Sequence, residues 1–397
     1  MIVEIERLDD FGRGICFINN KICFVENALI GEKVEIEIIH EKSKYLVGRV
    51  IKYFSKSKDR VKVDCPYYDI CGGCSLLHLK YEEENNYKKD KVKNKLKKFA
   101  GIEIDLDIKY RNQYNYRNKV VLHVKDNKIG FYNDKSNDLV EIDKCLLCSD
   151  KINNIISKIK DFDNSHIKEI MIRVSNDNKS SIISIYGDNY DDKYLDICDV
   201  FVFNDEIVTD NKYIYTNIDN VKYRLSYNSF FQINRYLTSD IYSYIKKFIL
   251  NNNINNIIDL YCGVGSIGIY VCNNTNIDLI GIDNNKSNIE DAIENSNENK
   301  CLAKYLVGDA SSFMKYDGEL IIVDPARSGL NKDTINNLIT YKSKYIIYVS
   351  CNDSTLARDL NILKDYYNII DMKVFNNFPR TYHVECISLL ERRNVEK

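Results

Sequence analysis

The sequence predicts an α/β protein whose C-terminal part is an open sheet covered by helices, preceded by a small β-barrel and a central α+β domain. Three observations support this prediction. Short apolar strands separated by glycine turns fill residues 1–56, as is typical of a small barrel. Residues 57–228 contain a cysteine-rich segment and further β-rich stretches. Residues 229–397 alternate apolar strands with helical segments, which favours a mainly parallel sheet.

The composition argues against several classes of protein. The chain has 397 residues, enough for two or three domains with separate cores. Its 56 basic and 58 acidic residues give a net charge of -2, so the average charge indicates no polyanionic partner. No apolar run reaches the roughly 18 residues of a membrane helix, and the start does not resemble a signal peptide. We therefore expect a cytoplasmic protein with no membrane partner and no obligate protein partner.

The first 56 residues carry a recognisable order of strands and turns. Gly12-Arg13-Gly14 precedes an apolar strand at 21–25, and the sequence ALIGEKV follows at 28–34. This order resembles the TRAM domain, an RNA-binding module of RNA-modifying enzymes, although the usual Pro-Gly-Glu is here Ile30-Gly31-Glu32. The resemblance implies that the barrel binds RNA.

Three of the thirteen cysteines form a C-x5-C-G-G-C pattern at Cys65, Cys71 and Cys74. Clustered thiols in a long cytosolic chain indicate metal or cluster ligands, and the two glycines let the backbone fold closely around such a group. A fourth thiolate is available at Cys145 or Cys148. Two C-x2-C pairs, Cys71/Cys74 and Cys145/Cys148, suit a zinc ribbon instead, but that arrangement leaves Cys65 unused.

The segment 87–125 is strongly basic, with twelve Lys or Arg residues against four Asp or Glu. A run of lysines is usually a solvated helix face, and we expect a basic helix near 77–108 that packs on the C-terminal domain, residues 229–397. Tyr110, Tyr114 and Tyr116 lie among these cations. Because RNA bases stack on aromatic rings while phosphates bind cations, we interpret the segment as a contact for RNA.

A glycine-rich turn follows the strand at 256–261. Gly263, Gly265 and Gly268 form G-x-G-x-x-G, and Asp283 ends the next strand twenty residues after the first glycine. An acid at this position binds ribose hydroxyls in both NAD-dependent and S-adenosylmethionine-dependent enzymes. The turn alone therefore leaves both classes open. Asp259, just before the turn, gives D-L-x-C-G-x-G.

Two further strands end in reactive side chains. The apolar run at 320–323 leads into Asp324 in the tetrapeptide D-P-A-R, and the run at 345–349 leads into Cys351 in S-C-N. Open α/β sheets place their chemistry at these carboxyl ends, so Cys351 is a candidate nucleophile. Downstream, His383 and Glu385 are rival proton acceptors, since histidine titrates near neutral pH.

The motifs C-x5-C-G-G-C, D-L-x-C-G-x-G, D-P-A-R and S-C-N, in this order, resemble the RNA (uracil-C5-)-methyltransferases over essentially the whole chain. The resemblance implies a class I, Rossmann-like methyltransferase domain, with Cys351 as nucleophile and Glu385 as proton acceptor. It implies a [4Fe-4S] cluster on Cys65, Cys71, Cys74 and Cys145, with a structural or RNA-docking role. Residues implied to bind S-adenosylmethionine are Gln232 (in an F-x-Q-x-N motif), Tyr261, Gly263, Ser266, Asp283, Asp309 and Asp324.

The reaction implied by the resemblance is methylation of uridine C5 through a covalent bond between Cys351 and C6. Family members with both the barrel and the cluster mostly act on 23S rRNA, which we therefore expect as the substrate. The T-loop uridine of tRNA is the alternative within the family. Two other classes remain as rivals: an NAD-dependent iron-sulfur oxidoreductase, and an RNA-binding protein without activity.

Overall fold

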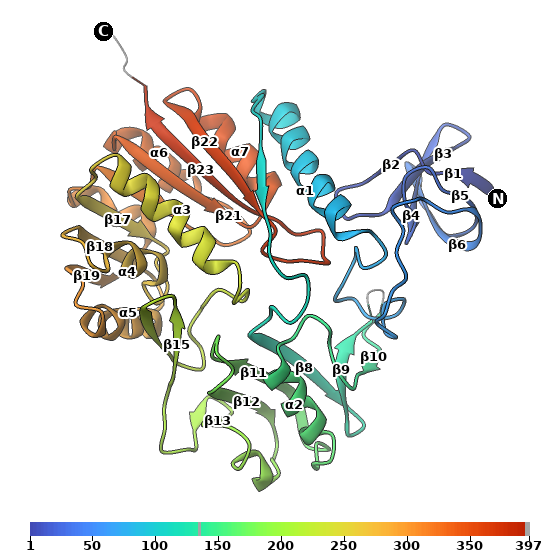
Figure 1. Cartoon of the computed structure of the whole chain (residues 1–397), viewed down its shortest axis with the longest axis horizontal. Helices are drawn as coiled ribbons and strands as arrows, with labels where there is room; N and C mark the ends of the chain where they lie inside the picture. Colours follow the sequence, from blue (N-terminus) through green and yellow to red (C-terminus); the bar gives the residue numbers. More distant parts are fainter. Residues whose placement is uncertain (134–135, 394–397) are drawn as a thin grey trace.

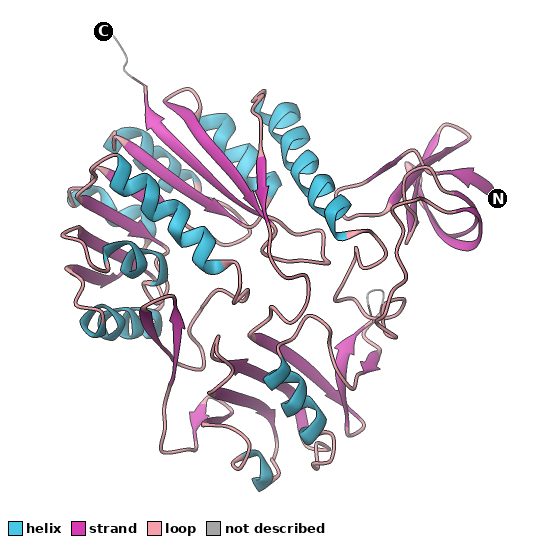
Figure 2. Ribbon diagram, viewed as in Figure 1, coloured by secondary structure: helices cyan, strands magenta, loops and turns pink. Residues whose placement is uncertain are grey.

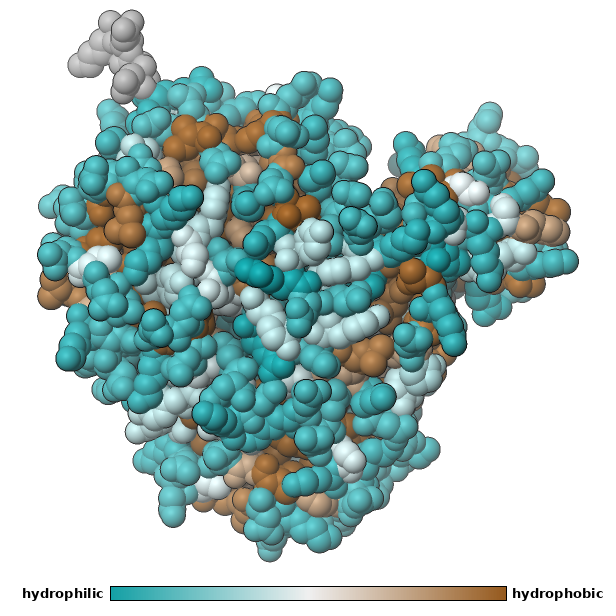
Figure 3. Space-filling view, viewed as in Figure 1, coloured by the Kyte–Doolittle hydropathy of each residue, from teal (hydrophilic) through white to brown (hydrophobic). Residues whose placement is uncertain are grey.

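The computed structural model describes residues 1–133 and 136–393 and shows three parts (Figure 1). A β-rich part holds the N-terminus, a second sheet lies at the bottom of the view, and the largest part contains most helices. The last four residues of the predicted catalytic range, 394–397, lie outside this description. Among the described helices, none has both the length and the apolar character needed to cross a membrane. On the face in Figure 3, hydrophilic side chains separate the hydrophobic patches.

The N-terminal part is a six-stranded sheet wrapped around its own core. The strand order is β1-β5-β6-β4-β3-β2, and the enclosed side chains are mainly Ile, Val, Ala and Cys. This arrangement agrees with the small barrel that the sequence predicts. The strands are β1 (Ile2–Glu4), β2 (Arg7–Leu8), β3 (Gly14–Ile18), β4 (Lys21–Glu26), β5 (Lys33–Glu41) and β6 (Tyr45–Ser55).

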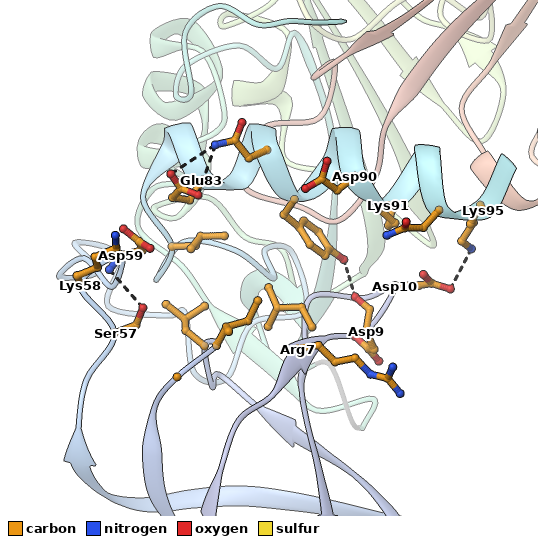
Figure 4. Close-up of a pocket in the computed structure, with 18 of the residues that line it drawn as sticks. Arg7, Asp9, Asp10, Ser57, Lys58, Asp59, Glu83, Asp90, Lys91 and Lys95 are labelled. Atoms are coloured by element: carbon orange, nitrogen blue, oxygen red, sulfur yellow. Dashed lines mark hydrogen bonds and ion pairs between the residues drawn. The ribbon is translucent and has the colours of Figure 1, made fainter. Parts of the chain in front are cut away.

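Buried and partly buried polar contacts attach the barrel to the rest of the chain. The Arg60 guanidinium, just after the barrel, donates to the fully buried Glu32 carboxylate at 2.5 and 2.7 Å. On the other side, the helix α1 (Tyr81–Lys95) approaches the barrel, and Lys95 pairs with Asp10 at 3.0 Å. A cavity of about 800 Å³ lies between α1 and the barrel (Figure 4).

The central part is a seven-stranded sheet with one helix packed on it. Its order is β10-β9-β8-β11-β12-β13-β14, and the helix α2 (Asp150–Ile159) buries isoleucines at 152, 155, 156 and 159. This 3–4 spacing presents one apolar stripe to the sheet. The strands are β8 (Lys119–Lys125), β9 (Lys128–Tyr132), β10 (Leu139–Glu141), β11 (Ile167–Val174), β12 (Ser181–Gly187), β13 (Val200–Phe203) and β14 (Glu206–Ile207). The short helix η2 (Asp192–Tyr194) precedes β13, and the hairpin β15 (Ile214–Ile218) and β16 (Val221–Leu225) follows β14.

The catalytic sheet has eight strands in the order β19-β18-β17-β20-β21-β23-β22-β7. All neighbours pair in parallel except β23, which runs antiparallel to both β21 and β22. The mainly parallel, helix-covered sheet confirms the predicted fold class. The strands are β7 (Asp107–Lys109), β17 (Asn256–Leu260), β18 (Asp278–Asp283), β19 (Ala303–Val307), β20 (Leu320–Val323), β21 (Tyr345–Ser350), β22 (Tyr367–Phe375) and β23 (Glu385–Arg392).

Helices cover both faces of this sheet (Figure 2). One face packs on α3, α4 and α5, and the other on α1, α6 and α7, because alternate strand residues join two separate cores. In β21, for example, Ile347 belongs to the first core, whereas Ile346 and Tyr348 belong to the second. The bounds are α3 (Thr238–Asn251), α4 (Ser266–Cys272), α5 (Lys286–Glu298), α6 (Lys332–Tyr341) and α7 (Asp353–Leu363), with short helices η1 (Leu96–Ala100) and η3 (Ala310–Lys315).

Candidate active site

The candidate active site lies where the strand order of the catalytic sheet reverses. In the chain, β17 is followed by β18 and β19 on one side and then by β20 and β21 on the other. Ligands of open α/β sheets bind beyond the carboxyl ends of the strands at such a point. Asp283, Asp324 and Cys351 end or directly follow β18, β20 and β21, so the fold gathers all three at this edge.

The loop between β17 and α4 has the tight geometry of a ligand-binding turn. Tyr261 and Gly263 have positive φ angles of 61° and 55°, and a tyrosine rarely adopts this conformation. The Gly263 N–H donates to the Asp283 carboxylate at 3.0 Å. At Gly268, an added Cβ would come within 3.0 Å of the buried Asp259 carboxylate, so the glycine leaves room for that acid. One structural unit therefore contains three of the residues predicted to bind S-adenosylmethionine, namely Tyr261, Gly263 and Asp283.

Two other residues predicted to bind S-adenosylmethionine form hydrogen bonds with neighbouring residues. The Ser266 hydroxyl, at the start of α4, accepts a hydrogen bond from the Tyr242 hydroxyl at 2.9 Å. Asp309 caps η3 by accepting the Ser311 N–H at 2.8 Å, and its hydrogen bonds from Ser311 lower the pKa of the Asp309 carboxyl. Both residues therefore have structural roles at the sheet edge in addition to the predicted one.

The strand register brings the candidate nucleophile and proton acceptor together. Ser350, the last residue of β21, pairs with Cys386 of the antiparallel strand β23. Continuing this register by one residue brings Cys351, just after β21, opposite Glu385, the first residue of β23, and the charge of Glu385 raises the pKa of the Cys351 thiol. Directly opposed residues of an antiparallel pair have Cβ atoms about 5 Å apart. This spacing suits a site in which a pyrimidine ring lies between the thiol of Cys351 and the carboxylate of Glu385.

Burial and mutual repulsion shift the pKa values of the acidic groups here upward. Glu385 is only 3% exposed, and burial together with the nearby Asp324 raises the pKa of Glu385 to about 8. Burial raises the pKa of Asp324 to about 7. Burial raises the pKa of the Cys351 thiol to about 12, with Glu385 and Asp324 contributing. Strongly shifted groups clustered in this way are typical of catalytic sites.

Two features favour the thiolate of Cys351 despite its raised pKa. The residue directly precedes Asn352, whose side chain caps α7 by accepting the Ser354 N–H at 3.0 Å. The positive end of a helix dipole near a thiol stabilises the thiolate. Arg327 of the D-P-A-R sequence lowers the pKa of Cys351, opposing the larger effect of burial. The motif therefore supplies a cation as well as the acid Asp324.

One amide side chain links Gln232 to Glu385, the candidate proton acceptor. Asn377 donates through Nδ2 to Gln232 Oε1 at 3.2 Å and to Glu385 Oε2 at 3.4 Å. The backbone carbonyl of Asn377 accepts a hydrogen bond from Asn234 Nδ2 at 3.0 Å. Asn377 therefore binds both Gln232 and Asn234 of the F-x-Q-x-N segment. Sequence analysis did not single out Asn377, because an asparagine in a polar loop has no distinguishing pattern.

His383 and Phe230 complete the surroundings of the site. Burial lowers the pKa of His383 to about 4, and the nearby cation Arg327 contributes, so the imidazole is neutral at physiological pH. The ring of Phe230, two residues before Gln232, is 62% exposed. An exposed phenylalanine beside buried catalytic residues is suited to stack on a planar ligand.

Family comparisons agree with this geometry. Residues 304–393 match the tRNA (uracil-5-)-methyltransferase family, residues 1–51 the TRAM domain, and residues 244–346 the methyltransferase small domain. An uncharacterized RNA methyltransferase of Aquifex aeolicus is 32% identical, over 98% of each chain. One from Caldanaerobacter subterraneus is 31% identical, over 98% of this chain and 97% of the relative. The chain belongs to the RNA uracil-5-methyltransferase family.

A solved structure supports the assignment over all three parts. The tRNA (uracil-54, C5)-methyltransferase of Pyrococcus abyssi, in complex with S-adenosyl-L-homocysteine, superposes with a TM-score of 0.83 at 25% identity. The match covers 98% of this chain and 100% of the archaeal one. The expected RNA methyltransferase activity is thereby confirmed, and the oxidoreductase alternative is contradicted.

In this methyltransferase, four cysteines line one cavity of about 400 Å³. Cys65, Cys71, Cys74 and Cys145 all face it, whereas Cys148 is fully buried in the core of the central part. Within residues 1–133 and 136–393, no three His, Cys, Asp or Glu side chains form a group able to hold one metal ion. The structure therefore gives no support to the zinc ribbon with Cys148 as a ligand.

The basic segment is more deeply buried than the sequence suggests. Lys88 is 0% exposed and donates to Asn376 Oδ1 at 2.6 Å, while Lys91 donates to the Tyr382 carbonyl at 2.6 Å. Tyr116 is buried, and Arg117 lies beside the cysteines. The buried side chains of Lys88, Lys91 and Tyr116 are therefore not available to RNA, whereas contact of Arg117 and the rest of the segment with RNA stays a prediction. Instead, Lys88, Lys91 and Tyr116 anchor the loop at 376–384 that leads to Glu385.

Proposed function

We propose that this protein methylates C5 of a uridine in 23S rRNA through a covalent bond between Cys351 and C6 of the base. The single observation that carries the proposal is the strand register, which puts Cys351 opposite Glu385. A uracil bound between them has one face toward a nucleophile and a proton acceptor nearby. Family membership supplies the reaction class, and the geometry supports the roles proposed for the two residues.

The first step is attack of the Cys351 sulfur on C6, which makes C5 electron-rich. Because the pKa of this thiol is raised by burial, its proton must leave as the base binds. Ionised Asp324 is the nearby acceptor for this proton, which leaves Glu385 ionised for the later step, while Arg327 and the start of α7 stabilise the sulfur anion. The resulting enolate of the pyrimidine is the species that accepts a methyl group at C5.

The second half of the reaction restores the aromatic base. After methylation, C5 carries both a methyl group and its original hydrogen. Glu385 takes that hydrogen as a proton, the electron pair re-forms the C5–C6 double bond, and the C6–sulfur bond breaks to release the Cys351 thiolate. Asn377 orients Glu385 for this transfer through its 3.4 Å contact.

S-adenosylmethionine is the methyl donor that the site fits. When bound, it supplies an electrophilic methyl group. Asp283 at the end of β18 is placed to bind ribose hydroxyls, with Gly263 and Tyr261 shaping the turn beside it. Gln232, Ser266, Asp309 and Asp324 stand around the same edge of the sheet. The archaeal relative bound to S-adenosyl-L-homocysteine supports this assignment.

The cysteine cavity fits a [4Fe-4S] cluster held by Cys65, Cys71, Cys74 and Cys145. After burial, the largest influences on the raised pKa of Cys74 are the other three cysteines, so the four thiols lie within electrostatic reach. The partly buried cation Arg117, whose Nε–H has no hydrogen-bond partner among the described residues, stands beside them. It balances the negative charge of thiolates. Each thiolate of such a cluster binds a different iron, so the four need not converge on one ion. We assign the cluster a structural or RNA-docking role.

A uridine of tRNA is the second candidate substrate. It is favoured by the archaeal relative, whose name specifies uracil-54 of tRNA and whose chain matches this one over all three parts. The ribosomal proposal rests instead on the combination of the barrel with the C-x5-C-G-G-C pattern. The barrel alone does not discriminate between them, because the tRNA enzyme is matched in that part as well.

The decisive experiment measures transfer of radiolabelled methyl from S-adenosylmethionine to unmodified rRNA and tRNA transcripts. We expect 5-methyluridine in digested 23S rRNA and none with Cys351→Ala, which should still bind RNA. Mapping 5-methyluridine in both RNAs from a strain lacking the protein then identifies the position. Label only in tRNA would assign the tRNA substrate, and label in neither would refute the proposed function.

A further inference from the structure

A second cavity, of about 480 Å³, lies where the barrel, the cysteine segment and the loop before Glu385 meet. Its lining includes Phe11 and Arg13 from the barrel, residues 68–75 of the cysteine segment, and Tyr382 and His383. The cavity is thus continuous with the catalytic loop, because His383 is two residues before the proton acceptor. Cys71 and Cys74 also line it as ligands of the proposed cluster, but none of its lining residues takes part in the methyl-transfer steps described above.

Aromatic rings form a continuous row along this cavity. The Phe11 ring stands edge-on to Tyr382 with 5.1 Å between centroids, and Tyr382 lies 4.2 Å from the ring of His383. The row therefore bridges two parts of the protein that are separated by about 370 residues of chain. Phe11 is 51% exposed, so the end of the row that belongs to the barrel is open to a ligand.

Cations accompany the rings. The Arg13 guanidinium lies 5.4 Å from the Phe11 centroid and is held by Asp9 through contacts of 2.8 and 2.7 Å. Lys91 Nζ lies 5.7 Å from the Tyr382 centroid. A fixed guanidinium beside an exposed ring suits a nucleotide, which offers a phosphate to the cation and a base to the ring.

We propose that this cavity binds an unpaired nucleotide of the substrate RNA that flanks the methylated uridine, with its base stacked on the exposed ring of Phe11 and in contact with Tyr382. The proposal rests on the proposed function, because it places this nucleotide next to the uridine held between Cys351 and Glu385. The phosphate lies on the side of Arg13. Glu26 and Asp69 also line the cavity, and carboxylates accept hydrogen bonds from base amino groups while repelling phosphate. The site is therefore suited to a base with an exocyclic amino group.

The row of rings also indicates how contact between the barrel and the catalytic loop would help the reaction. A uridine must leave its stack to reach a buried nucleophile, and a neighbouring base that stacks elsewhere lowers the cost of opening the RNA. Phe11 and Tyr382 provide such a surface within reach of the catalytic loop. The neutral form of His383, whose pKa burial lowers to about 4, extends the row of rings without adding a charge.

The test measures binding of unmodified 23S rRNA and tRNA transcripts by filter retention, in the absence of methyl donor. Phe11→Ala and Tyr382→Ala should each raise the Kd about five-fold or more, since stacking of one base on an aromatic ring has this order of effect. The conservative changes Phe11→Tyr and Tyr382→Phe should stay within about two-fold of the unmodified protein. Phe54→Ala is the matched control, because Phe54 lies on the same barrel, is 48% exposed and has Lys52 over its ring at 5.1 Å.

Unchanged RNA affinity in Phe11→Ala, or an equal loss in Phe54→Ala, would overturn the proposal. Calorimetric binding of S-adenosylmethionine shows whether each variant keeps a folded catalytic part, and Phe11 itself lies in an exposed turn of the barrel. Photo-crosslinking of transcripts containing 4-thiouridine should yield a peptide that includes Tyr382, and the yield should fall in Phe11→Ala. Because binding and crosslinking need no methyl transfer, their outcome is separate from that of the proposed function.

Discussion

The roles of Glu385 and His383 can be separated by the pH dependence of one step. If Glu385 takes the C5 proton, resolution of the covalent adduct requires its ionised form. Since burial and Asp324 raise the pKa of Glu385 to about 8, a small part of it is ionised at neutral pH. That part is about a tenth at pH 7 and about a half at pH 8, so the rate of resolution should rise about five-fold over this interval and then level off. Glu385→Gln should remove the rise and slow resolution by about 10²- to 10⁴-fold.

The measurement is a single-turnover reaction with radiolabelled methyl donor, stopped in detergent at each pH. Adduct appears as labelled RNA that migrates with the protein, and product as labelled free RNA. Glu385→Gln should accumulate adduct, whereas Cys351→Ala should form none. Glu391→Gln, at the other end of the same strand β23, is the matched control and should behave as the unchanged protein.

A different profile would refute the assignment. His383 has a pKa of about 4, so a base at that position is already neutral above pH 6 and gives a flat profile between pH 6 and 9. If the flat profile is observed, or if His383→Gln traps the adduct while Glu385→Gln resolves it at nearly the normal rate, then Glu385 is not the proton acceptor.

Three further predictions address other parts of the molecule. Cys145→Ala should lose iron and acid-labile sulfide from anaerobically purified protein, whereas Cys148→Ala should keep both; equal iron in the two variants would contradict the ligand assignment. Asp283→Ala should weaken calorimetric binding of S-adenosylmethionine about ten-fold or more, because a charged hydrogen-bond acceptor for the ligand and for the Gly263 loop is removed. Arg60→Ala should lower the free energy of unfolding by about 3–5 kcal/mol in urea titrations, because it leaves the Glu32 carboxylate buried without its partner. An Arg60→Ala protein of unchanged stability would show that the ion pair is not needed to fix the barrel.

Much of the site could be predicted from sequence because the chemistry lies at strand ends. An apolar run followed by a reactive residue is visible in the sequence for both Asp324 and Cys351, and parallel strands of one sheet end at a common edge. Glu385 was harder to assign, since it begins an antiparallel strand. Its position opposite Cys351 depends on the register between β21 and β23, which no local pattern encodes. Only the resemblance to a family indicated its role.

The helix α1 shows why the rest could not be predicted. Sequence reasoning expects a buried helix face to be apolar, but α1 buries Glu84, Asn85, Lys88 and Lys91 together with Val92. These polar groups are satisfied by partners about 290 positions later in the chain, such as Asn376, which accepts from Lys88 and donates to Glu84. A lysine run that looks like a solvated surface is therefore the interior of an interface. Long-range pairing of this kind is not visible in any window of sequence.

The same pairing explains how a distant cysteine segment bears on the position of the proton acceptor. Directly after Cys74, the backbone N–H groups of Ser75 and Leu76 donate to the carbonyl of Arg380 at 3.0 and 3.1 Å. Arg380 has a positive φ of 68°, a conformation that persists in a non-glycine residue only where its surroundings impose it. Its guanidinium donates in turn to the buried Glu84 of α1 at 3.2 Å. Any group that orders the four cysteines therefore also orders the loop that ends at Glu385, although it lies outside the chemistry of methyl transfer.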